Sequence, residues 1–206
     1  MVAPETAIAG IEQVWPGQLC VFDSIGKEER QAFYWSVPQS GEAAPIDETE
    51  LARVLEECVH LHMASDVPLG VFLSGGVDSS AMANLAQKSS RAPIHTFTLA
   101  FDEQEYNEGN FARRIAEAIG TQHQEIVLTE QHFIAQLDAA LNSLDQPTFD
   151  GLNSYYMAHA VREAGFKVAL VGTGGDELFG GYKSFQDLPA LLRWSQRTRW
   201  IPKAVR

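Results

Sequence analysis

The sequence predicts an α/β fold, a parallel sheet with helices on both faces, preceded by a short β-rich segment. From residue 67 onward, short apolar runs alternate with stretches of helical periodicity, as in consecutive β–α–β units. Turn residues, chiefly glycine, separate these segments. With 206 residues, 45% of them hydrophobic and 20% charged, the chain is long enough to bury a core.

The first 45 residues predict a separate β-rich unit followed by a linker. Residues 19–22 and 31–35 are apolar-aromatic runs, and the polar segment between them contains Gly26, as expected of two short strands and a turn. Residues 38–45 are small and polar, which is typical of a linker. We therefore divide the chain into residues 1–45 and residues 46–206.

The second unit begins with a helix. Asp47 and Glu50 have the spacing of a capping box, and one face of the helix then carries Leu51, Leu55, Cys58, Val59 and His62. Strands are expected at 67–73, 94–101, 124–128 and 167–172, and helices at 81–88, 107–119, 133–141 and 154–164. Ligands of such sheets bind beyond the carboxyl ends of the strands, so the loops after Leu73, Phe101 and Gly172 are the candidate site.

Composition excludes several classes of protein. Fifteen basic and 27 acidic residues give a net charge of −12, which argues against a nucleic-acid or anionic-membrane surface. Two cysteines cannot form a disulfide scaffold or a cysteine-based zinc site. Apolar runs fall short of the ~20 residues of a membrane span, and the start lacks a signal-peptide pattern, so we expect a cytoplasmic protein. The basic residues after Asp187 form either a solvated surface or a docking surface.

Residues 74–80 read Ser-Gly-Gly-Val-Asp-Ser-Ser between a strand and a helix, and we interpret them as a phosphate-binding loop. Two glycines let backbone amides approach a ligand, the hydroxyls of Ser74, Ser79 and Ser80 can donate, and the helix N-terminus attracts negative charge. Asp78 fits a Mg²⁺ that the phosphates share. The string is not a Walker A loop, which needs a lysine. The alternative is a tight turn with a serine helix cap.

Two strings carry a resemblance to a known family. Ser-Gly-Gly-x-Asp-Ser resembles the pyrophosphate loop of the N-type ATP pyrophosphatases, and Val-Gly-Thr-Gly-Gly-Asp-Glu-Leu-Phe-Gly-Gly-Tyr at 171–182 resembles the signature of the glutamine-hydrolysing asparagine synthetases. The strings at 105–108 and 120–125 are similar to that family as well. Val-Trp-Pro-Gly at 14–17 and Tyr34-Trp35 look like the end of its glutaminase domain.

The resemblance implies an adenine nucleotide alpha hydrolase-like fold and ATP-dependent amide synthesis. Aspartate would be activated as β-aspartyl-AMP with release of pyrophosphate, and ammonia would then displace AMP. The implied cofactors are ATP and Mg²⁺, and the implied metal ligands are Asp78 and Asp176. Residues 74–76, Ser79 and Ser80 would bind the phosphates, while the residues matching the adenosine-binding positions are Leu73, Leu99, Val171 and Gly172. For Leu99 and Val171, packing in the core is the alternative. Ammonia, or glutamine used through a separate glutaminase domain, would be the second substrate. A homodimer is a further option for the assembly.

Three differences from the family pattern limit what the resemblance implies about activity. Position 2 is Val, where the glutaminase domain has its cysteine nucleophile, so residues 1–45 are expected to be a remnant that does not hydrolyse glutamine. Thr173, the third catalytic candidate, stands where the family usually has an acid, and a hydroxyl cannot act as base or charge partner. The chain is also expected to be truncated before a helical region and its catalytic lysine. The alternatives are a non-catalytic ATP- or AMP-binding remnant or interaction subunit, or a β-lactam synthetase-like ligase.

Overall fold

A parallel sheet forms the centre of the computed structural model, which describes residues 3–37, 45, 47–101, 109–148 and 150–197. Within these residues the sheet has four strands in the order β5-β4-β3-β6, and each neighbouring pair is parallel. The strands are β3 Leu69–Phe72, β4 His95–Phe101, β5 Gln122–Leu128 and β6 Val168–Leu170. The parallel sheet predicted from the alternating pattern is confirmed.

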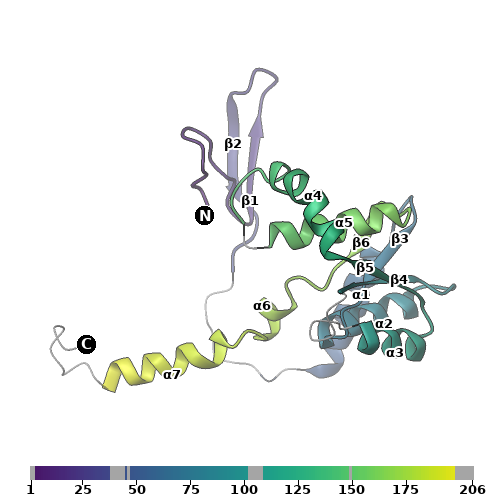
Figure 1. Ribbon diagram of the computed structural model, residues 1–206. Helices are drawn as coiled ribbons and strands as arrows, with labels where there is room; N and C mark the ends of the chain where they lie inside the picture. The colour runs from purple at the N-terminus through teal and green to yellow at the C-terminus, as the bar shows by residue number, and fades with distance from the viewer. Residues whose placement is uncertain (1–2, 38–44, 46, 102–108, 149, 198–206) are drawn as a thin grey trace.

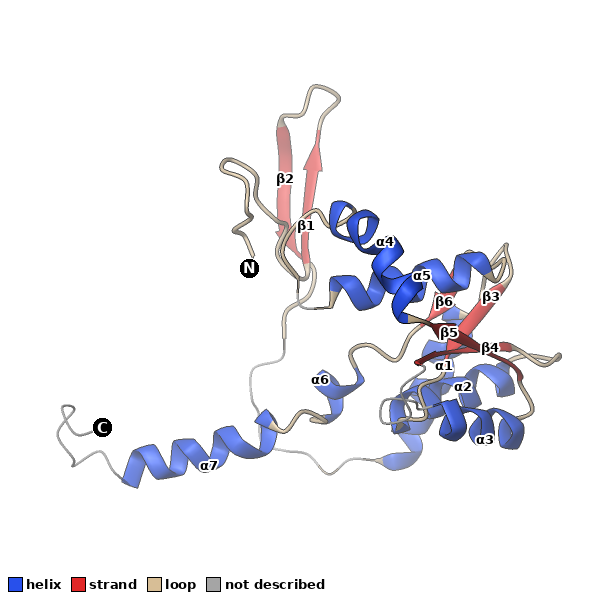
Figure 2. Ribbon diagram, viewed as in Figure 1, coloured by secondary structure: helices blue, strands red, loops and turns tan. Residues whose placement is uncertain are grey.

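Helices cover both faces of this sheet (Figure 1). On one face lie α1 Glu48–His62, α2 Val77–Ser89 and α3 Gly109–Ile119, and on the other α4 Glu130–Asn142 and α5 Gly151–Glu163 (Figure 2). After β6 come α6 Gly175–Phe179 and α7 Ser184–Arg197. The expected start of α1 is confirmed, because the Asp47 carboxylate accepts hydrogen bonds from the amides of Thr49 and Glu50. In contrast, α2 begins at Val77 rather than at residue 81, so the preceding loop is shorter than predicted.

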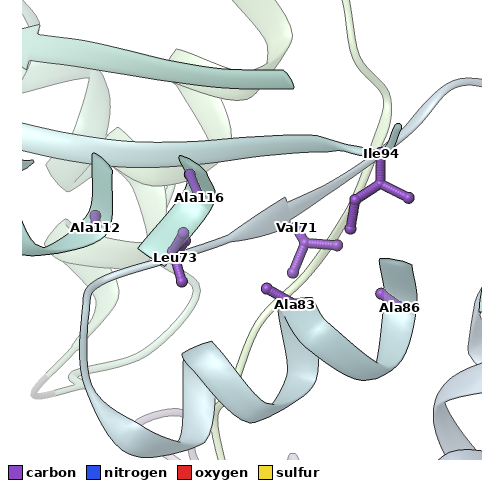
Figure 3. Close-up of a cluster of buried hydrophobic side chains, with 7 residues drawn as sticks. All are labelled: Val71, Leu73, Ala83, Ala86, Ile94, Ala112 and Ala116. Atoms are coloured by element: carbon purple, nitrogen blue, oxygen red, sulfur yellow. The ribbon is translucent and has the colours of Figure 1, made fainter. Parts of the chain in front are cut away.

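Strand β3 is buried on both faces. Its Val71 packs in one cluster, formed by Val71, Leu73, Ala83, Ala86, Ile94, Ala112 and Ala116 (Figure 3). Phe72 packs on the opposite face with Phe97 and Val161. Successive side chains of a strand point to opposite faces, so one short strand links the two halves of the core. The loop that follows β3 therefore starts from a rigid base.

Two expected helix faces are corrected by the structure. Apolar periodicity predicts that Phe111, Ile115, Ala118 and Ile119 share one face of α3. Ile115 and Ile119 do pack against the core cluster, beside the fully buried Ala112 and Ala116, but Phe111 is 65% exposed and Ala118 is exposed as well. Small alanines let the helix lie close to the sheet, and hydrophobicity alone does not reveal that preference. Cys58, predicted to pack on the apolar face of α1, is exposed. None of the residues of α1, all of which the structure describes, has a fully buried side chain.

The two ends of the described chain expose apolar side chains. Strand β1 Gln18–Phe22 pairs antiparallel with β2 Glu28–Phe33, which confirms the predicted β-rich start. Helix α7 extends away from the sheet (Figure 1), and Leu188, Leu191 and Leu192 are exposed along it. The division at residues 45/46 stays a prediction. Among the described helices, none combines the length and apolar character needed to cross a membrane.

Candidate functional site

The sheet order brings the loops after β3 and β6 together. From β3 the chain continues to β4 on one side, whereas β6 pairs with β3 on the other, so the direction of winding reverses between β3 and β6. Ligands of open parallel sheets bind at this switch point, beyond the carboxyl ends of the strands. A cavity of about 530 Å³ lies here. The predicted site residues that line it are Ser74, Gly76, Asp78, Ser79, Val171, Gly172, Thr173 and Asp176.

Two glycines lie directly against the carboxylates of Asp78 and Asp176 in this cavity. A Cβ added to Gly175 would overlap the carboxylate of Asp78, and one added to Gly181 would overlap that of Asp176. The loop after β6 therefore runs directly against the Asp78 side chain at the start of α2. Both aspartates are half-buried. In the part of the chain that the structure describes, no three His, Cys, Asp or Glu residues gather as a metal-binding cluster. A cation held here would take carboxylates from Asp78 and Asp176 and further oxygens from its ligand, which suits Mg²⁺ bound with phosphates.

Serine hydroxyls close the loop after β3. The Ser79 hydroxyl lies 3.2 Å from the Gly76 carbonyl oxygen and 2.9 Å from the Ser74 hydroxyl, and it accepts a hydrogen bond from the Ser74 amide. The Ser80 hydroxyl donates to the same Gly76 carbonyl at 2.6 Å. These two hydroxyls thus shape the loop from within, and their predicted role as phosphate donors stays a prediction.

The N-terminus of α2 opens onto the cavity. Its N-cap residue, Gly76, makes no side-chain capping hydrogen bond, while Gly76, Val77 and Asp78 all line the cavity. The first amides of a helix have no acceptor within the helix, so this end favours a negatively charged group. Gly75 does not line the cavity. Its φ of +88° turns the chain, and an added Cβ would meet Phe111 Cβ of α3 at 3.0 Å.

The residues expected at the adenosine are divided between two cavities. Val171 and Gly172 line the 530 Å³ cavity. Leu73 and Leu99 border an adjoining space of about 210 Å³, which shares Phe72, Ser74 and Met157 with it. Leu73 is also part of the core, with 1% of its surface exposed, so lining and packing are combined in one residue. Their contacts with adenosine stay a prediction.

Sequence reasoning missed Met157 and Asn153 of α5. Met157 lines both cavities, and Asn153 lines the smaller one. A larger hollow of about 950 Å³ continues between α5 and β6, where Met157, Asn153 and Thr173 are joined by Arg162 and Lys167. The signal was the spacing of Asn153, Met157 and Val161, which places them on one helix face. What the sequence lacked was the position of that helix over the sheet edge.

The turn after α6 is fixed by its own polar contacts. The Tyr182 hydroxyl donates to Glu177 at 2.8 Å, and this hydrogen bond to a carboxylate raises the pKa of Tyr182 above its ordinary value. Gly180 adopts a positive φ of +71° at the end of the helix.

Of the other family-like strings, 120–125 enters β5, whereas 105–108 lies outside the described residues.

Comparison with known proteins identifies the family. A family model described as asparagine synthase matches residues 50–206. The chain belongs to the asparagine synthase family. A relative from Mycobacterium tuberculosis is 39% identical over 159 residues, covering 76% of this chain and 24% of its own length. Asparagine synthetase [glutamine-hydrolyzing] 1 of Bacillus subtilis is 30% identical over 208 residues, covering 98% of this chain and 32% of its own length. This asparagine synthase family chain thus spans about a quarter to a third of the length of the curated relatives it matches.

Relatives and solved structures with other names are similar too. Amidase chyE of Penicillium rubens is 27% identical over 207 residues, with 90% of this chain and 31% of its own length covered. The NMN synthetase structure from Francisella tularensis has a TM-score of 0.48 and 20% identity, and the match covers 68% of this chain and 61% of that one. The NH3-dependent NAD synthetase from Campylobacter jejuni has a TM-score of 0.45 and 18% identity, with coverage of 66% and 61%.

Proposed function

We propose that this chain is the ATP-activating part of an asparagine synthase-type amide ligase. The observation that carries the proposal is that Asp78 and Asp176, from the first turns of α2 and α6, line one cavity at the open N-terminus of α2, where Gly175 and Gly181 lie against their carboxylates. Such an end binds phosphate without a lysine, and paired carboxylates without a cation would repel each other. The chain belongs to the asparagine synthase family, whose model matches residues 50–206, and this supports the same conclusion.

The proposed reaction begins with attack of an acceptor carboxylate on the α-phosphorus of ATP. In this proposal the side-chain carboxylate of aspartate forms β-aspartyl-AMP, pyrophosphate leaves, and ammonia then attacks the acyl carbon and releases AMP. The backbone of residues 74–78 and the end of α2 would stabilise the charge that develops on the leaving pyrophosphate. Asp78 and Asp176 would hold Mg²⁺, which when bound neutralises part of the phosphate charge.

The remaining assignments follow from the same proposal. Adenosine would lie against Leu73, Leu99, Val171 and Gly172. Glutamine would provide ammonia through a separate glutaminase domain, of which residues 1–45 would be the end. The homodimer and the cytoplasmic setting stay predictions.

Thr173 favours a second candidate, an ATP- or AMP-binding module without turnover. Thr173 borders both the 530 Å³ cavity and the larger hollow beside it, at the position where the family resemblance leads us to expect an acid. Its hydroxyl can donate a hydrogen bond but brings no negative charge. A third possibility, favoured by the relative named Amidase chyE, is a ligase that takes an acceptor other than aspartate.

Binding of Mg·ATP by calorimetry tests the site. Val at position 76 would put a branched side chain into the cavity at the start of α2, so Gly76→Val should weaken Mg·ATP binding by about tenfold or more, roughly 1.4 kcal/mol. Ala81→Val adds the same side chain one turn further along α2, outside the cavity lining, and should bind as the wild type does. Equal affinity of the wild type and Gly76→Val would refute the proposed phosphate site.

Product analysis separates the candidates. The wild type is given Mg·ATP, aspartate and ammonia, and pyrophosphate and asparagine are measured. Release of both products supports the ligase, whereas tight ATP binding with intact nucleotide supports the non-catalytic module. Release of pyrophosphate only with another carboxylic acid would support a ligase of different specificity.

A further inference from the structure

A chain of polar side chains crosses the sheet beneath α3. The Thr96 hydroxyl of β4 lies 2.8 Å from the Thr121 hydroxyl and 3.0 Å from Nδ1 of His123, which is on β5. Nε2 of His123 is 3.5 Å from the Thr98 hydroxyl. That hydroxyl donates in turn to the carbonyl oxygen of Leu73. Both threonines on β4 are buried, with 0% and 3% of their surface exposed. The chain of contacts ends at the residue that precedes the phosphate-binding loop.

The last contact fixes the direction of the whole chain. A carbonyl oxygen only accepts, so the Thr98 hydroxyl donates its hydrogen bond to the Leu73 carbonyl oxygen, and the Thr98 oxygen is left to accept from Nε2–H of His123. A neutral imidazole that donates from Nε2 must accept at Nδ1, so the Thr96 hydroxyl donates there and accepts from Thr121. Burial lowers the pKa of His123, which favours this neutral form.

Two charged groups face this histidine, and they neutralise each other. Glu125 of β5 and Arg113 of α3 form a two-bond ion pair, with Nε to Oε1 at 2.8 Å and Nη2 to Oε2 at 2.9 Å. The glutamate raises the pKa of His123 and the arginine lowers it, and both effects are smaller than that of burial. The neutral histidine is therefore set by the buried environment of the sheet and α3.

Leu73 and Gly75 hold the start of the phosphate-binding loop against β4 and α3. The Leu73 amide donates to the carbonyl oxygen of Phe97 at 2.8 Å, while its own carbonyl accepts from Thr98. Two residues on, Gly75 packs against the first turn of α3. Figure 3 shows Leu73 together with Ala112 and Ala116 of α3 in the same cluster. Ser74, whose amide donates to Ser79 inside the loop, is thus anchored on both sides.

We propose that Thr98 and His123 are positioning residues that orient the Leu73–Ser74 peptide, and through it the amides of the phosphate-binding loop. Thr98 also lines the 210 Å³ space beside Leu99, but the role proposed for both residues is exerted through the Leu73 carbonyl and not by contact with the ligand. The inference rests on the proposed function, because it assumes that this loop binds the phosphates of ATP. It makes the hydroxyl of a buried sheet threonine a determinant of phosphate affinity.

The test compares two substitutions at one position. Thr98→Val keeps the shape of the side chain but removes the hydroxyl, whereas Thr98→Ser keeps the hydroxyl. Calorimetry measures the affinity for Mg·ATP and for AMP, because AMP lacks the β- and γ-phosphates. Thr98→Val should lower the ratio of ATP to AMP affinity by about tenfold, the size of one hydrogen bond. Thr98→Ser should keep most of the wild-type ratio.

A destabilising control separates positioning from general loss of stability. Ile94→Val trims a buried side chain just before the start of β4, whereas Thr98 lies within the strand. It should lower the melting temperature and leave the ATP to AMP ratio within about twofold of the wild type. If Thr98→Val does not fold, Thr98→Ala removes the same hydroxyl and is measured instead.

The outcomes are distinguishable. A wild type that does not bind Mg·ATP overturns the proposed function itself. A wild type that binds, with an unchanged ratio in Thr98→Val or an equal fall in Thr98→Ser, overturns only the positioning role. Failure of both hydroxyl-free variants to fold, or a comparable fall in Ile94→Val, would make Thr98 a purely structural residue and would also overturn it.

Discussion

Thr173 shows how one residue can decide between two functions of the same cavity. Its neighbours along the chain include Gly172, Gly174 and Gly175, and the last of these lies against the carboxylate of Asp78. Glycines therefore shape the segment on both sides of Thr173, and Thr173 itself presents a hydroxyl to the cavity. A family acid at this point would add a third carboxylate beside Asp78 and Asp176. Such a group would act only with a cation or a protonated partner present.

We predict that Thr173→Glu raises aspartate-dependent release of pyrophosphate by at least about tenfold, roughly 1.4 kcal/mol of activation free energy. The physical reason is that a carboxylate can act as base or charge partner, which a hydroxyl cannot. The control is Thr173→Gln, which has nearly the size of glutamate and no charge. Pyrophosphate release is measured for the three proteins at equal ATP saturation. A gain below tenfold, or the same gain for the glutamine variant, would mean that the missing charge does not limit the reaction.

At the scale of the element, strands and helices are the part of the fold that the sequence predicts best. The strands around Val71 and Leu170 and the helix that Asp47 caps follow from apolar runs and a capping residue. The buried face of α3 follows only in part: Ile115 and Ile119 pack on the core as the periodicity predicts, but the fully buried residues are Ala112 and Ala116, and the larger Phe111 is exposed. Helix periodicity identifies a face, but close packing on a sheet selects small residues on it.

The meeting of the two acidic loops depends on strand order, which local sequence does not encode. Asp78 and Asp176 each follow a predicted strand, so the sequence predicts that both lie at the carboxyl edge of the sheet. Their sharing of one cavity requires β3 and β6 to be neighbours, and that pairing is made by residues almost 100 positions apart. Met157 escaped prediction for the same reason, since α5 reaches the edge only through the packing of the whole sheet.

We predict that Asp78 and Asp176 act as one unit on a shared Mg²⁺. Asp78→Asn and Asp176→Asn should each weaken Mg·ATP binding by about tenfold or more, while the double variant should lose little beyond either single one. The reason is that removal of one ligand already releases the cation. A double-mutant cycle, measured by calorimetry with and without Mg²⁺, gives the coupling free energy directly. Losses that add within about 0.5 kcal/mol would show two independent groups and exclude the shared ion.

At the scale of the whole molecule, β3 connects the site to the core. Its side chains enter both apolar clusters, and the carbonyl of Leu73, the residue that follows it, is held by the threonine–histidine chain. By contrast, α7 and the β1–β2 hairpin expose apolar residues such as Leu192 and Phe33. Exposed apolar surface of this kind is typical of interaction sites. The described chain thus combines a well-packed sheet edge, which carries the proposed ATP site, with peripheral elements that expose apolar side chains.

The half-buried His123 also makes the stability of the whole domain depend on pH. Burial lowers the pKa of His123 in the folded protein, while the unfolded chain keeps the ordinary value of about 6.5. Below that value the unfolded state takes up the proton first, so the free energy of unfolding falls as the pH drops. The contribution of His123 is therefore fully present above about pH 6.5 and is lost as the pH falls through its lower folded pKa.

We predict that His123→Gln, which has no titrating group, flattens the fall in unfolding free energy between about pH 7 and pH 5. Urea unfolding at a series of pH values measures this slope in the wild type and the variant, and acidic residues common to both cancel in the difference. His60→Gln, on the exposed surface of α1, controls for removal of an imidazole. Parallel curves for the wild type and His123→Gln would show that the folded protein accepts the proton at no cost. The threonine–histidine chain beneath α3 would then not depend on the neutral form that its geometry implies.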